Sequence, residues 1–78
     1  MSDKKKAARR YVVCLNNKGY RASLERNKIY VVLPDSGAEV EGDIRVIDES
    51  GEDYLFPADY FVAIEVPKAV EASLRKAS

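Results

Sequence analysis

The sequence predicts a small all-β protein, a five-stranded barrel followed by a short C-terminal helix. Three observations support this prediction. Short runs rich in β-branched and aromatic residues recur along the chain, and turn residues separate them. With 78 residues the chain has room for only one domain. Apolar residues at helical spacing occur only near the end, around Pro67.

Five segments have the composition of strands, and each ends at residues that favour turns. Asn16, Asn17 and Gly19 follow the first, Pro34 follows the second, and Pro57 follows the fourth. The third and fourth flank a hairpin turn at residues 49–52. The predicted strands are residues 11–15, 28–33, 43–48, 53–56 and 61–66.

The remaining segments predict loops and one helix. Residues 20–27 lack any periodicity and predict an irregular loop with Leu24 turned inward, and residues 35–42 predict a turn and a polar connection. Val66, Val70 and Leu74 recur every four residues, so residues 67–78 predict a helix with one apolar stripe. An isolated helix of this length is marginal in water, so the stripe is expected to dock on the barrel or on a partner, with a homodimer as one option.

Charge is distributed unevenly, although the net charge is zero. Residues 1–10 carry five Lys or Arg against one acid, a net charge of +4. Residues 11–66 carry a net charge of −6, and residues 67–78 a net charge of +2. This predicts three parts: a basic flexible arm at 1–10, an acidic barrel at 11–66 and the helix at 67–78.

Composition argues against an enzyme. The chain has no histidine and a single cysteine, Cys14, so histidine-dependent nucleophiles and zinc frameworks are excluded. A barrel this small has little concave volume in which a carboxyl pKa could be raised. No cofactor is expected. The basic start lacks the apolar stretch of a signal peptide and no apolar run could span a membrane, so a cytoplasmic location without membrane contact is expected.

The segment LFPADYFV at residues 55–62 resembles the segment that ends SH3 domains. In that family the Pro-x-x-Tyr spacing, here Pro57 to Tyr60, lies on one 3₁₀ turn between the last two strands. Residues 23–33 resemble the diverging turn and following strand of the same family, and residues 42–44 resemble the start of its third strand. The chain is also similar to short bacterial proteins with an SH3-like barrel, which bring no known activity.

SH3 domains bind proline-rich peptides in an aromatic groove, and the resemblance carries only part of that groove. Pro57 and Tyr60 match it. Asn16 and Asn17 stand where the family has an aromatic pair, and Ile44 stands where it has a tryptophan. A proline-rich ligand is therefore not expected.

The preferred prediction is a non-catalytic module that binds a protein or peptide as a monomer or weak homodimer. Its candidate surface is Tyr20, Tyr54, Pro57 and Tyr60, flanked by the acids Glu25, Asp35 and Asp59. These aromatic residues could instead form the core, and burial is the favoured interpretation for Phe56. Leu55 and Phe56 are adjacent in a strand, so they are expected to face opposite ways.

Two charged segments provide weaker candidates. Lys4, Lys5, Lys6, Arg9 and Arg10 could contact nucleic acid as an accessory protein does, although a solubilising arm is favoured and the acidic body would repel phosphates. The acids between Asp48 and Asp53 could hold a cation, but their spacing misses the EF-hand pattern, and a solvated hairpin tip is preferred.

Overall fold

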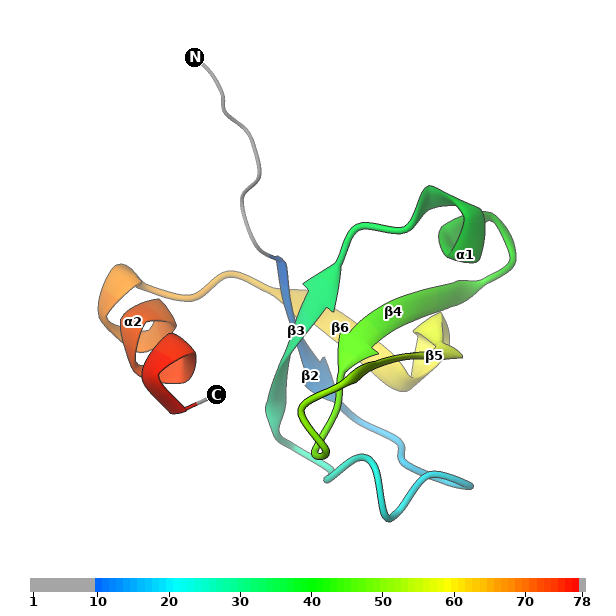
Figure 1. Cartoon of the computed structure of the whole chain (residues 1–78), viewed down its shortest axis with the longest axis horizontal. Helices are drawn as coiled ribbons and strands as arrows, with labels where there is room; N and C mark the ends of the chain where they lie inside the picture. The colour runs from blue at the N-terminus through cyan, green and yellow to red at the C-terminus, as the bar shows by residue number, and fades with distance from the viewer. Residues whose placement is uncertain (1–9, 78) are drawn as a thin grey trace.

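The computed structural model describes residues 10–77, which form one twisted antiparallel sheet with two helices and a 3₁₀ turn (Figure 1). The elements in chain order are β2 (Arg10–Cys14), β3 (Ile29–Leu33), α1 (Ser36–Val40), β4 (Asp43–Ile47), β5 (Asp53–Pro57), η1 (Ala58–Tyr60), β6 (Phe61–Ile64) and α2 (Lys68–Ala77). The strands lie in the order β5-β4-β3-β2-β6. All five predicted strands are present, with ends shifted by one or two residues.

The sheet is not closed, so the predicted barrel is wrong at this point. Strands β5 and β6 form the two ends of the sheet and do not pair with each other in the described part of the chain. Turn η1 connects the two strands and forms hydrogen bonds with other parts of the chain. The Ala58 amide donates to the Gly42 carbonyl, and the Tyr60 carbonyl accepts from the Leu15 amide. The Phe56 ring of β5 and the Phe61 ring of β6 lie 6.3 Å apart, so an aromatic pair connects the two edge strands.

The core lies on one face of the sheet. Register places Val12, Val32, Val46 and Phe56 on this inner face, and the side chain of Phe56 is only 1% exposed. Leu24 reaches the same cluster from the irregular loop after β2, as predicted. The buried cluster consists of Val12, Cys14, Leu24, Tyr30, Val32, Val46, Phe56 and Phe61.

A short helix replaces the predicted polar connection after β3. Helix α1 forms because the Asp35 carboxylate accepts a hydrogen bond from the Ala38 amide at 3.0 Å, and Ala38 packs inward. Gly42 then has a φ of +86°, a conformation that favours glycine, and leads the chain into β4. Five residues give too little periodicity to distinguish such a helix from a turn.

The first and last strands also differ from the prediction in their ends. Strand β2 begins at Arg10, which had been assigned to the arm, and stops at Cys14, leaving Leu15 exposed. Strand β6 stops at Ile64, two residues early, and residues 65–67 lead to α2. Pro67 cannot donate to a ladder, which is consistent with the strand ending before it.

Candidate interaction surface

Two tyrosines from separate segments contact the Phe56 ring, and a third tyrosine contacts one of them. The ring of Tyr20, from the loop after β2, meets the Phe56 ring edge-on with centroids 5.0 Å apart. Tyr54 of β5 lies 5.4 Å from Phe56, and Tyr60 of η1 lies 6.0 Å from Tyr20. Pro57 directly follows Phe56 and begins the turn that carries Tyr60. The structure thus brings together all four residues predicted from the sequence, and we call them the aromatic surface.

Hydrogen bonds hold the two loop tyrosines in place. The Tyr60 hydroxyl donates to the Lys18 carbonyl at 2.9 Å, and the Tyr60 carbonyl accepts from Leu15 and Asn16. The Tyr20 amide donates a hydrogen bond to the Asn17 carbonyl, and the Tyr20 carbonyl accepts one from the Leu24 amide at 2.8 Å. These hydrogen bonds therefore fix the backbone that carries Tyr20 and Tyr60, and the buried Phe56 ring lies beneath the aromatic surface.

The three tyrosines differ in how much they offer to a ligand. The Tyr54 side chain is 60% exposed, whereas Tyr20 and Tyr60 are half-buried and pack against the core. Edge-on stacking fixes ring directions, and tyrosine combines an apolar face with a hydroxyl. The arrangement can therefore stack on a flat or aliphatic group and bond to a polar one.

The acids predicted to flank this surface are not all beside it. Glu25 and Asp59 are exposed, and Asp59 adjoins Tyr60 in η1. The Asp35 carboxylate instead accepts a hydrogen bond from Arg45 at 2.8 Å. The same Arg45 side chain also donates to Asp53. Arg45 pairs with Leu55 in the sheet, so this trio lies on the face opposite Phe56. Asp35 is therefore removed from the predicted surface.

The residues that depart from the SH3 pattern have structural contacts here. The Asn17 side chain donates to the Leu24 carbonyl at 3.0 Å, and the Asn16 side chain accepts from the Lys18 amide at 2.9 Å. Ile44 packs against the core. These side chains shape the loop and the inner face.

The nucleic-acid alternative falls largely outside the described residues. Lys4, Lys5, Lys6 and Arg9 belong to residues 1–9, and only Arg10 is placed. Arg10 is part of β2, and its guanidinium pairs with Glu39 at 2.7 Å. One of the five predicted phosphate contacts is thus already paired with an acid.

Carboxylates of the acidic hairpin bind groups of the chain itself. The Asp48 carboxylate accepts from the Ser50 amide at 2.9 Å, and Asp53 pairs with Arg45. Gly51 has a φ of +85°, as the predicted hairpin turn requires. Across residues 10–77 no three Asp, Glu or Cys side chains are grouped so that they could hold a metal ion.

Glu49 joins the hairpin tip to β3. Its carboxylate accepts a hydrogen bond from the Tyr30 hydroxyl and pairs with the Lys28 ammonium at 2.7 Å. The hydrogen bond from Lys28, with that from Tyr30, lowers the pKa of Glu49 below its ordinary value. Burial, followed by the bond to Glu49, raises the pKa of the Tyr30 hydroxyl.

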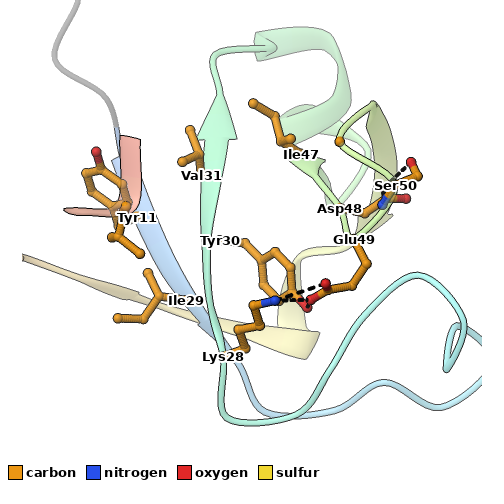
Figure 2. Close-up of a pocket in the computed structure, with 11 residues that line it drawn as sticks. Tyr11, Lys28, Ile29, Tyr30, Val31, Ile47, Asp48, Glu49 and Ser50 are labelled. Carbon is orange, nitrogen blue, oxygen red and sulfur yellow. Dashed lines mark hydrogen bonds and ion pairs between the residues drawn. The ribbon is translucent and has the colours of Figure 1, made fainter. Parts of the chain in front are cut away.

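A groove on the outer face of the sheet was not predicted. Figure 2 shows Tyr11, Ile29 and Val31 on one side of it, Ile47 on the other, and the Glu49 cluster at its end. Its volume is about 370 Å³. The signal in the sequence was the unbroken apolar run from Ile29 to Leu33, since strands covered on only one face alternate with polar residues.

No family model matches the chain, and neither a curated protein nor a solved structure matches it at a significant level. Among the described residues, no helix combines the length and the apolar character needed to cross a bilayer.

Proposed function

We propose that this chain is a non-catalytic interaction module with an SH3-like arrangement, which binds a protein or peptide through the aromatic surface. The fold part of the proposal is supported by the five short strands and by η1, which follows Pro57 and carries Tyr60 between the last two strands. This is where the resemblance to SH3 domains expects a 3₁₀ turn.

The observation that carries the functional part is the position of Tyr54. It is a large aromatic side chain, 60% exposed, supported at its base by the buried Phe56 ring. Exposed aromatic residues on a rigid support are typical of sites where a few side chains provide most of the binding energy. Tyr20 and Tyr60 continue the same surface.

The proposed ligand is a basic or mixed peptide, not a proline-rich one. The body of the chain carries a net charge of −6, and Asp59 is exposed beside Tyr60. A basic peptide would be attracted by this charge and would approach faster at low salt. The proline-rich groove would need aromatic residues at the positions of Asn16, Asn17 and Ile44.

The test compares Tyr54→Ala with the wild type and with Val40→Ala. Val40 lies on α1 and is 83% exposed, so it controls for loss of an exposed apolar side chain elsewhere. Each protein is titrated with basic, neutral and acidic peptide pools, followed by amide NMR shifts. We expect saturable shifts around Tyr20, Tyr54 and Tyr60 with the basic pool, weakened at least tenfold in Tyr54→Ala and unchanged in Val40→Ala. Equal binding by all three proteins would contradict the proposal.

A further inference from the structure

The part of the outer face formed by β2, β3 and β6 is apolar, where an open sheet is normally polar. Pairing places Tyr11 beside Val31 and Ile64, and Val13 beside Ile29 and Val62, all on the face opposite the core. Val62 is 46% exposed. Strands that are apolar on both faces are typical of sheets covered on both sides. Some element is therefore expected to cover this face.

The groove, with a volume of about 370 Å³, lies on this face. Ile29, Val31 and Ile47 line it (Figure 2), and Leu74 of α2 also belongs to its lining. Ile47 belongs to β4, and β3 lies between β4 and β2 in the sheet. The helix of the same chain thus borders the groove at one side.

Helix α2 is itself only partly covered. It follows β6 after the three residues 65–67 and stands beside the sheet (Figure 1). Leu74 is half-buried, but Val70 on the same stripe is 38% exposed. A ten-residue helix is marginal without an apolar contact along its length. Both the helix stripe and the groove therefore have apolar area left to bury.

The groove and the sequence of the helix carry net charges of opposite sign. Among the lining residues, Asp48 and Glu49 outweigh Lys28, which gives the groove a net charge of −1. The sequence of residues 68–77 has three Lys or Arg against one Glu, a net charge of +2. A second copy of this helix is therefore attracted to the groove of the first.

We propose that the groove is the contact surface of a homodimer, in which α2 of a second copy lies over the outer face of the sheet. A two-fold axis makes the contact reciprocal, because each chain offers one groove and one helix stripe. The second helix covers Ile29, Val31 and Ile47, which are only half-buried in the single chain. The contact lies on the face opposite Phe56, so it is independent of the aromatic surface.

Light scattering over a dilution series of the full chain tests the mass. We expect twice the chain mass at high concentration and the single-chain mass on dilution. Leu74→Asp and Ile47→Asp are each expected to give the single-chain mass at every concentration, while Val40→Asp on α1 keeps the wild-type series. Circular dichroism checks that each variant retains its sheet. A wild-type protein that stays monomeric, or a dimer that survives both variants, overturns the proposal.

Disulfide trapping identifies which chain supplies the helix. Chains carrying only Val31→Cys are mixed with chains carrying only Leu74→Cys and then oxidised, while the native Cys14 is fully buried. We expect a covalent dimer that contains both chains and is absent when Val40→Cys replaces Leu74→Cys. If folded chains of the two kinds form no mixed disulfide, the proposal is overturned, and the groove is left to another occupant.

Discussion

The hydroxyl of Tyr60 donates a hydrogen bond to the carbonyl of Lys18, 42 residues earlier in the chain. This bond connects the turn before the last strand to the loop after the first described strand. It also positions the Tyr60 ring 6.0 Å from Tyr20. The aromatic surface therefore depends on a tertiary contact, and substitutions at Tyr60 can remove its hydroxyl and its ring separately.

Tyr60→Phe removes this hydrogen bond and keeps the ring. We expect a loss of about 0.5 to 1 kcal/mol in the free energy of unfolding, because the bond is exposed to solvent, and little change in peptide binding. Tyr60→Ala removes the ring as well and is expected to weaken binding. Urea titration and peptide titration on both variants measure the two effects. Equal binding by Tyr60→Ala and wild type would exclude this ring from the site.

Phe56→Ala is expected to cost about 3 to 5 kcal/mol, because it removes a buried ring that three other aromatic rings contact. The neighbouring Leu55 faces the other way and is 37% exposed. Leu55→Ala is therefore the matched control, expected to cost less than about 1.5 kcal/mol. Chemical unfolding curves compare the two. Similar losses would mean that the core is not centred on Phe56.

Glu49 is expected to make stability depend on acid. Because folding lowers the pKa of Glu49 below 4.5, its charged form stabilises the fold fully above that pH. This contribution disappears as the pH falls through the lower pKa of the folded state. Glu49→Gln keeps the hydrogen-bonding shape without the charge, so we expect its stability difference from wild type to shrink as the pH falls below 4.5.

Urea unfolding from pH 7 to pH 3 measures this difference. Glu52→Gln, on the same hairpin turn, serves as the control for loss of a negative charge. A difference between wild type and Glu49→Gln that stays constant over this pH range would show that the Lys28 pairing has no part in acid stability.

Asp35 is expected to have two separable roles. Its side chain accepts from the Ala38 amide at the start of α1 and from Arg45 at 2.8 Å. Asparagine caps helices nearly as well as aspartate, so Asp35→Asn loses only the charge pairing with Arg45. We expect Asp35→Ala to lose about 0.5 to 2 kcal/mol and Asp35→Asn clearly less, measured by thermal unfolding. The reverse order would contradict the capping role.

Cys14 is expected to be unreactive in the folded chain. Its side chain is fully buried, and burial raises the pKa of the thiol, so little thiolate exists at neutral pH. A thiol reagent should therefore label native protein slowly and denatured protein fast. Labelling at the same rate in both states would show that β2 opens readily. The sulfur also donates to the Asn16 carbonyl at 3.3 Å.

Local pattern in the sequence was enough to predict most elements of the sheet. β-Branched runs and turn residues predicted the five strands, whereas the 3₁₀ turn between the last two was expected from the resemblance of residues 55–62 to SH3 domains. These signals are local, since strand propensity and turn chemistry act within a few residues. The burial of Leu24 could also be predicted, because it is the only large aliphatic residue of its loop.

Tertiary structure alone decided whether the sheet closes and which charged side chains pair with one another. The sheet is open because β5 and β6 do not pair within residues 10–77, and η1 between them bonds instead to Gly42 and to Leu15, contacts that span many residues and leave no periodic signal. The same is true of Asp35, which pairs with Arg45 and not with the aromatic surface, and of α1, which is too short for periodicity. The apolar run in β3 indicated a second covered face, but only the three-dimensional register showed where α2 meets it.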